Sequence, residues 1–154
     1  MSESSPPIRS VHTTMLAIRL GTDLYAIPLE AVEEVLPALP VEAVPLCPAF
    51  VRGVVYVRGR LIPVVDAAER LGLKQHERPD EPPIVCIRVD GRLAGVEVDE
   101  AIDLMDLASE HVFAADDLGL REGLLSGLVE KDGRTIRILD PAKLVAREVW
   151  SACA

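Results

Sequence analysis

Short apolar runs separated by turn residues occupy most of this chain. Within residues 13–20 the apolar side chains of Leu16, Ile18 and Leu20 alternate with other positions, so they share one face of an extended segment. Alternation over four to eight residues, bounded by glycine, proline or aspartate, is typical of β-strands. The pattern predicts a mainly β protein, with strands in the first half at residues 13–20, 24–28, 32–36, 51–57 and 60–65.

Polar and proline-rich stretches separate these runs. Four prolines make residues 37–48 a loop, and residues 74–83, KQHERPDEPP, form a linker. Asp66 is followed three residues later by Glu69, which is the pattern of a capping box at a helix start. We therefore interpret Asp66 as an N-cap rather than a catalytic carboxylate.

The second half of the chain repeats the first. Residues 84–105 align without a gap on residues 15–36, and the apolar positions mostly coincide. Residues 53–68 match residues 127–142 at seven of sixteen positions, including both glycines, the arginine after the turn and the aspartate. Glycine at a tight hairpin turn adopts positive φ at no steric cost. The sequence predicts two copies of a roughly five-stranded β unit, each ending in a short helix, and closed barrels rather than open sheets.

This repeat sets the expected organisation of the chain. We predict one domain made of two lobes, with a loop and a helical turn at residues 107–125 as the longer connection of the second copy. The expected parts are a disordered arm at 1–12, a domain at 13–147 with lobes at about 13–73 and 84–147 joined by the linker 74–83, and a tail at 148–154.

Composition narrows the class of function. The chain of 154 residues has a formal net charge of −9, which disfavours nucleic acid and anionic membranes as partners. Hydrophobic residues make up 49% but aromatic residues only 3%, so the core is expected to be aliphatic. There is no run of 18 apolar residues and no secretory signal pattern. Three cysteines without CxxC spacing are typical of reduced thiols in a cytoplasmic protein.

Residues for catalysis or metal binding do not converge in this sequence. His12, His76 and His111 lack the spacing of metal ligands, and no phosphate-binding or nucleophile motif occurs. We therefore expect no enzyme activity, no cofactor and no metal. The basic residues Arg58 and Arg60, around the turn at Gly59, stand out because the chain is so acidic.

The run PAFVRGVVYVRGRLIPVVDAAERLGL, residues 48–73, resembles the signature of CheW-like coupling domains, and GRLAGVEVDEAIDLMDL, residues 91–107, resembles a second motif of that family. The resemblance extends from about residue 13 to 147. It implies two five-stranded, SH3-like β-barrel lobes packed side by side with short helices. It also implies a non-catalytic adaptor, which couples the cytoplasmic tips of chemoreceptors to the regulatory domain of a CheA-type histidine kinase in chemotaxis.

The resemblance also implies where partners bind. A receptor tip would lie in a groove between the lobes, in the helix-in-groove mode of recognition. Gly53 falls where the family is sensitive for partner binding, and Tyr56 and Val57 stand where the family usually has Asn and Leu. The expected receptor-binding residues are Val32, Glu34, Arg58, Ala101 and Leu104, and the expected kinase- or partner-binding residues are Gly53, Tyr56 and Val57.

Two other functions are left open. The departure at Tyr56 suggests an adaptor of a non-flagellar chemosensory array, such as one for twitching or surface attachment. A small-molecule sensor is disfavoured because ligand pockets are usually lined by aromatic side chains, which are few here. Arg58 aligns with Asp132 in the second copy, so the fold itself does not require it. We expect nearby acidic groups to order Arg58 on the receptor-facing side.

Overall fold

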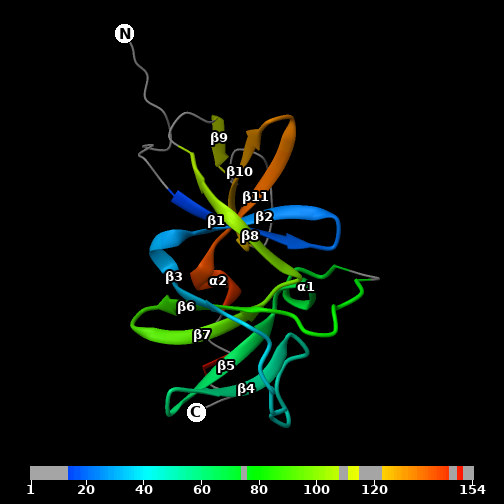
Figure 1. The fold of residues 1–154 in the computed structure, drawn as a ribbon, viewed down its shortest axis with the longest axis vertical. Coiled ribbons are helices and arrows are strands. Elements are labelled where there is room, and N and C mark those ends of the chain that lie inside the picture. Colours follow the sequence, from blue (N-terminus) through cyan, green and yellow to red (C-terminus); the bar gives the residue numbers. More distant parts are fainter. Residues whose placement is uncertain (1–13, 74–75, 108–110, 115–122, 146–148, 151–154) are drawn as a thin grey trace.

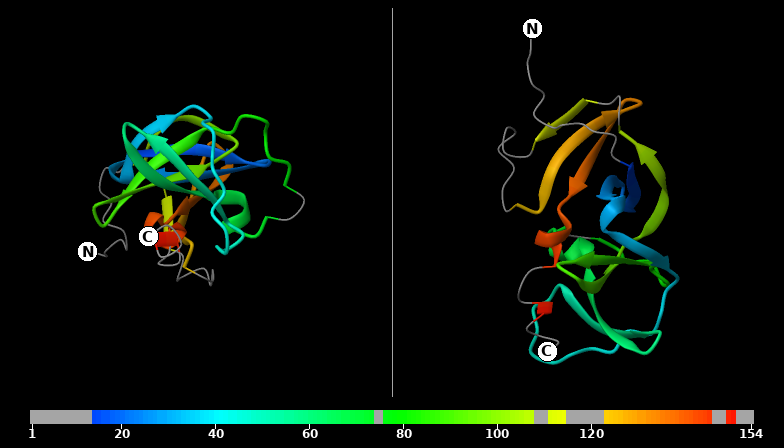
Figure 2. Two further views of the ribbon diagram at one scale, coloured as in Figure 1. Left: turned by 90° about the horizontal axis from the view of Figure 1, so that it is seen from below. Right: turned by 90° about the vertical axis from the view of Figure 1, so that its left-hand side faces the viewer.

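A computed structural model describes residues 14–73, 76–107, 111–114, 123–145 and 149–150. It consists of two β-sheets, one above the other along the long axis of the molecule, with a few short helices (Figures 1 and 2). No helix within the described residues is long and apolar enough to cross a membrane. The predicted arm at 1–12 and most of the predicted tail at 148–154 lie outside the described residues.

The first sheet has six strands in the order β8-β1-β2-β11-β10-β9. These strands are β1 (Thr14–Leu20), β2 (Asp23–Pro28), β8 (Glu100–Asp106), β9 (His111–Ala114), β10 (Leu125–Lys131) and β11 (Arg134–Leu139). The second sheet has five strands in the order β3-β6-β7-β5-β4. They are β3 (Val32–Leu36), β4 (Val51–Val57), β5 (Arg60–Asp66), β6 (Ile84–Val89) and β7 (Arg92–Glu97).

The two sheets are equivalent, which confirms the internal repeat. Replacing β8, β1, β2, β11 and β10 by their repeat counterparts gives β3, β6, β7, β5 and β4, which is the order of the second sheet. The bulges recur as well. The β4–β5 register shifts between Val51 and Gly53, and the β10–β11 register shifts between Leu125 and Gly127, at matching positions.

The repeats exchange strands, and the structure differs here from the expected division into lobes. Strands β1 and β2 belong to the sheet that holds β8 to β11, whereas β6 and β7 belong to the sheet that holds β3 to β5. Parallel pairs of β2 with β11 and of β5 with β7 join strands from opposite halves of the chain. Neither lobe therefore corresponds to residues 13–73 or 84–147 alone.

Within the residues that the structure describes, neither sheet closes into a barrel, so that part of the prediction is wrong. The edges are covered locally instead. Strand β9 pairs along β10. At the equivalent edge, Glu42 and Val54 exchange two backbone hydrogen bonds of 2.9 Å. Because these contacts satisfy part of each edge, the sheets need no full closure. The segment 107–125 accordingly contains strand β9, where a loop and a helical turn were expected; residues 108–110 and 115–122 lie outside the described residues.

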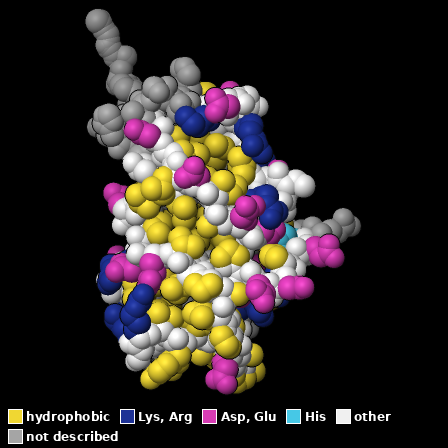
Figure 3. Space-filling model, in the orientation of Figure 1, with side chains coloured by type: hydrophobic (Ala, Val, Ile, Leu, Met, Phe, Trp, Pro, Cys, Tyr) yellow, Lys and Arg dark blue, Asp and Glu magenta, His cyan; other side chains and the backbone are white. Residues whose placement is uncertain are grey.

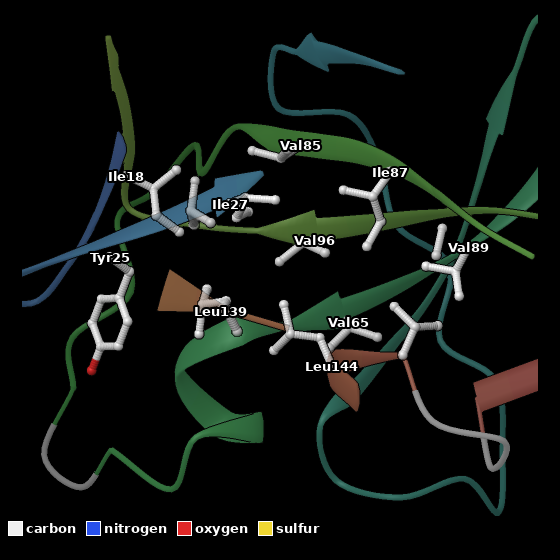
Figure 4. Packing of buried hydrophobic residues seen from close by; sticks show 14 of the residues in the cluster. Ile18, Tyr25, Ile27, Val65, Val85, Ile87, Val89, Val96, Leu139 and Leu144 are labelled. Carbon is white, nitrogen blue, oxygen red and sulfur yellow. The ribbon is translucent and has the colours of Figure 1, made fainter. Parts of the chain in front are cut away.

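Most of the buried aliphatic side chains lie between the two sheets. Leu16, Ile18 and Leu20 point into this core as predicted, and Val85 and Ile87 of the repeat join them (Figure 4). Each sheet also curves around a smaller core of its own, one containing Met15 and Ile136, the other Val55 and Ile62. Strands buried on both faces explain why apolar runs here exceed simple alternation.

Short helices follow the last strand of each repeat. The side chain of Asp66 accepts a hydrogen bond from Glu69 N (3.2 Å) and that of Asp140 one from Ala142 N (3.0 Å), so both are N-caps. Leu71 and Leu73, which follow the first helix, pack against the central core. The helices are α1 (Ala67–Arg70), α2 (Pro141–Leu144) and a 3-10 turn, η1 (Leu29–Ala31).

The predicted linker is tied to the protein surface. His76 Nε2 lies 2.8 Å from Asp99 Oδ1, and Arg78 Nη2 donates to Asp66 Oδ2 over 2.5 Å. Pro83 O accepts a hydrogen bond from Val98 N over 3.1 Å. Residues 76–83 therefore form an ordered connection between the repeats.

Candidate functional site

The predicted receptor-binding residues lie on two edge strands, one in each sheet. Val32 and Glu34 are on β3, the edge of the five-stranded sheet, and Ala101 and Leu104 are on β8, the edge of the six-stranded sheet. In Figure 1, β8 crosses the front of the upper sheet and β3 the front of the lower one. We call the surface formed by these two strands and by Arg58 the β3–β8 face.

Apolar side chains gather on this side of the molecule, with charged side chains around them (Figure 3). Val32 is half-buried and packs against the central core, while Leu104 is 53% exposed. Val35 and Ile102, on the same two strands, are also exposed. These last two were missed in the sequence because an apolar residue on a predicted strand is assigned to the core by default.

Arg58 and Glu34 form a bidentate ion pair on the β3–β8 face. Arg58 Nη2 donates to Glu34 Oε1 over 2.8 Å, and Arg58 Nη1 donates to Glu34 Oε2. The two residues come from opposite edges of the five-stranded sheet, since β3 is one edge and the β4–β5 hairpin is the other. The pair therefore connects the ends of a curved, open sheet. The expectation that acidic groups order Arg58 is confirmed.

The ion pair affects both partners' protonation. The guanidinium of Arg58, by its hydrogen bonds, holds the pKa of Glu34 below its usual value, and Glu34 raises the pKa of Arg58. The side chain of Arg58 is 69% exposed and that of Glu34 27% exposed. Such an exposed pair contributes little to global stability. The pair is therefore of interest for the position in which it holds the two side chains on the β3–β8 face.

The hairpin that carries Arg58 has a constrained turn. Arg58 and Gly59 have φ values of 48° and 80°, so both central residues are left-handed, as two-residue hairpins of this kind require. Asp132 and Gly133 repeat this geometry with 54° and 75°. An arginine at positive φ is uncommon. The turn places its side chain on the side of β3.

The predicted kinase- or partner-binding residues occupy different environments. Tyr56 is 69% exposed and lies opposite Leu61, which is 65% exposed. Val57 packs into the core of the five-stranded sheet. Gly53 is buried with φ 143°, and a Cβ there would lie 2.0 Å from Glu42 O, so glycine is required by the backbone. Of the three, Tyr56 is the one that presents its side chain at the surface.

The acidic and histidine side chains that could suggest catalysis or metal binding lie away from the β3–β8 face. A pocket of about 590 Å³ lies beside α1 and is lined by residues that include Asp66, His76 and Arg78. Within the described parts of the chain, no group of three or more His, Cys, Asp or Glu side chains is arranged to hold a metal ion. His12 is outside the described residues.

Comparison with known proteins gives consistent results. The family model described as CheW-like domain matches residues 14–149. The chain is 27% identical over 128 residues to the chemotaxis protein CheW of Rhizobium meliloti, covering 82% of this chain and 83% of that protein. It is 29% identical over 134 residues to the chemotaxis protein CheW of Thermotoga maritima, covering 85% and 86%.

A solved structure supports the fold. The scaffolding protein TtCheW from Thermoanaerobacter tengcongensis superposes with a TM-score of 0.77 at 21% sequence identity, covering 84% of this chain and 90% of that one. Two sheets with few short helices are therefore common to both proteins.

Proposed function

Because this chain belongs to the family of CheW-like domains, we propose that it is a non-catalytic adaptor that couples chemoreceptors to a CheA-type histidine kinase in the cytoplasm. The observation that carries the proposal is the family match over residues 14–149. It is supported by the relatives named chemotaxis protein CheW, each of which the chain covers over most of its length.

The β3–β8 face is the proposed site for the receptor's cytoplasmic signalling tip. Its apolar side chains, Val32 and Leu104, would contact the apolar stripe of a helical hairpin. The Arg58–Glu34 pair would provide polar contacts beside that stripe. Ala101 lies on the same strand as Leu104, and its small side chain would permit close approach of a helix.

Tyr56 and Leu61 form the proposed surface for the kinase regulatory domain. They are opposite each other on β4 and β5 and are both largely exposed. Their adjacent apolar surfaces would be removed from water on contact with a partner. Gly53 and Val57 would act on this surface indirectly, by holding the shape of β4. A tyrosine at this contact also fits a kinase other than the flagellar one, so a non-flagellar array stays the alternative.

The test is a binding assay of the purified chain with a receptor signalling-tip fragment and, separately, with the regulatory domain of the cognate kinase. We expect each partner to bind, in the micromolar range that modest transient interfaces usually give. A folded chain that binds neither partner would exclude the proposal.

Arg58→Ala tests the assigned face. It should weaken binding of the receptor fragment by about three- to tenfold. The substitution removes one cation from the proposed site and the two charge-assisted hydrogen bonds that hold Glu34 in place. The melting temperature should change by no more than about 2 °C, since the pair is exposed. Arg134→Ala, on β11, is the matched control, because Arg134 is exposed and has no partner among the described residues. A large fall in melting temperature would instead make Arg58 a structural residue.

A further inference from the structure

Two arginines at equivalent positions of the repeat each bind a glutamate of the neighbouring edge strand. Arg19 on β1 aligns with Arg88 on β6, and this is one of few identities between those segments. Arg19 Nε donates to Glu100 Oε1 over 3.1 Å, and Arg88 Nε donates to Glu33 Oε1 over 3.1 Å. In each case the acceptor is on the adjacent edge strand, β8 or β3.

Each arginine also holds its own hairpin turn. Arg19 Nη1 donates to Gly21 O over 2.8 Å, and Arg88 Nη1 donates to Gly91 O over 3.4 Å. The guanidinium therefore connects the turn of a central hairpin with the neighbouring edge strand. Since the repeats have few other identities in these segments, the shared arginine indicates that this connection has a role in both sheets.

A β-bulge interrupts both edge strands near these contacts. The β3–β6 register moves from Val32 to Glu34, so Glu33 has no partner in the ladder. The β1–β8 register shifts likewise between Ala17 and Ile18, leaving Ile102 unpaired. A bulge disrupts the backbone ladder and changes the direction of the side chains beside it. The side chain of the bulged Glu33 is the one that Arg88 binds.

The residues beside the two bulges are those of the β3–β8 face. Val32 and Glu34 flank Glu33, and Ala101 and Leu104 lie one residue before and two residues after Ile102. Both strands are sheet edges, so their backbone is hydrogen-bonded to a strand on one side only. The direction of these side chains therefore depends on a bulge with weak backbone support.

We propose that Arg19 and Arg88 are positioning residues, which hold the bulged edge strands β8 and β3 in the conformation that binds the receptor tip. This inference rests on the proposed adaptor function. Neither arginine needs to contact the receptor: each acts through the edge strand that carries the contact residues.

The exposure of the contacts separates this role from a general effect on stability. The side chains of Arg19 and Glu100 are 39% and 56% exposed, and those of Arg88 and Glu33 are 44% and 42% exposed. Ion pairs this exposed change global stability little. Arg19 Nη1 also lies 3.7 Å from Asp99 Oδ2, whose side chain is 6% exposed, so the separation from stability applies to Arg88. Edge strands, however, open locally at lower free energy than the core, so the loss of one contact affects them first.

The experiment measures the affinity of single and double variants of the full chain for the receptor signalling-tip fragment and for the kinase regulatory domain. Arg88→Ala and Arg19→Ala should each weaken receptor binding roughly two- to fivefold, the range that exposed ion pairs usually give. The double variant should show about the product of the two losses, because the contacts are on separate strands. Kinase binding of all three variants should match that of the Arg134→Ala control, and so should the melting temperature of Arg88→Ala.

Charge reversal provides the rescue. Arg88→Glu should weaken receptor binding more than Arg88→Ala, because it places two glutamates side by side. The double variant Glu33→Arg with Arg88→Glu should restore receptor affinity to within about twofold of the wild type. If wild-type protein binds the receptor and the arginine variants bind equally well, the positioning role is excluded. It is also excluded if kinase binding falls together with receptor binding, or if the melting temperature of Arg88→Ala does.

Hydrogen–deuterium exchange gives a readout that needs no partner. In Arg88→Ala, amides of residues 32–36 should exchange at least twofold faster while those of β2 and β11 stay unchanged, and in Arg19→Ala the same should hold for residues 100–106. If the wild type binds no receptor but these segments exchange faster, the adaptor function fails and the arginines still position the strands. Unchanged exchange in both segments would overturn the inference itself.

Discussion

At the scale of single residues, the Arg58–Glu34 pair is the most specific feature of the proposed receptor surface. It joins two edges of one sheet through a side chain on a left-handed turn residue. The second repeat has Asp132 at the equivalent turn position. The pair therefore belongs to one repeat alone, and this asymmetry marks the face that a partner would distinguish.

The protonation of Glu34 should reveal this pair in solution. Its pKa is lowered in the folded state by the hydrogen bonds from Arg58, so the pair's contribution is present above the unfolded-state pKa and is lost as the pH falls through the lower folded value. A carbon-13 NMR titration of the glutamate side chains should show Glu34 titrating below the usual range of a glutamate side chain. In Arg58→Ala its pKa should return toward that usual range. A Glu34 resonance unaffected by the substitution would show that the pair does not persist in solution.

Sequence alone predicted part of this contact. Arg58 aligns with Asp132, a residue of opposite charge, which indicated that the fold does not require an arginine at this turn. Nearby acidic groups were expected to order the side chain of Arg58. The identity of the partner and the burial of Gly53 and Val57 were not accessible. They depend on how far the sheet curves and on how close Glu42 approaches Gly53, and neither is encoded in local alternation.

At the scale of elements, the two helix starts are equivalent in sequence but not in environment. Asp66 is 6% exposed and also binds Arg78, whereas Asp140 is half-buried and caps α2 without an ion pair among the described residues. Arg78 Nε also lies 3.8 Å from Glu97 Oε1, so the first cap is part of a charged cluster. Glu97 is 5% exposed and accepts a hydrogen bond from Arg52 Nε over 3.0 Å.

Substitution of the two caps should separate these roles. Asp140→Ala should lower the free energy of unfolding by about 1 kcal/mol, the usual value of an N-cap. Asp66→Ala should lower it by about 2–3 kcal/mol, because a charge-assisted bond is lost with the cap. Asp140→Asn should be nearly neutral, while Asp66→Asn should still lose stability, since asparagine caps a helix but cannot pair with Arg78. Urea denaturation measures all four; equal losses at both sites would mean that Arg78 contributes nothing.

Strand positions were predictable because alternation, turn glycines and prolines are local signals. The start of the first helix followed from Asp-x-x-Glu for the same reason. Strand β9, at His111–Ala114, was missed because a four-residue segment between polar stretches has too few positions to show a period. The sequence analysis also missed that the sheets stay open, with β9 and Glu42 covering their edges. A sheet edge can be protected either by closure into a barrel or by such a local contact, and the strand pattern is the same in both cases.

At the scale of the whole molecule, the exchange of strands between repeats determines how the chain holds together. The repeat was visible in the sequence, but two arrangements satisfy it: each copy can form its own sheet, or the copies can exchange strands. Strands such as β1 and β6, which are buried on both faces, pack equally well in either arrangement. The pairs that join opposite halves of the chain distinguish them: β1 with β8, β2 with β11, β3 with β6 and β5 with β7.

Neither half of the chain should therefore fold alone. Without residues 76–154, β1–β2 and β4–β5 remain as isolated hairpins, and β3 loses β6, its partner in the ladder. Two-stranded hairpins are at best marginally stable in water. The second fragment keeps the three strands β9, β10 and β11, but it loses Met15 and Ala26, which complete their core. The fragments 1–75 and 76–154 should each show a disordered circular dichroism spectrum and no cooperative thermal transition. Mixed at equal concentration, they should form a one-to-one complex with the spectrum of the intact chain, because the central core requires side chains from both. A fragment that melts cooperatively as a monomer would show that one half holds a sheet of its own, contrary to the exchanged topology.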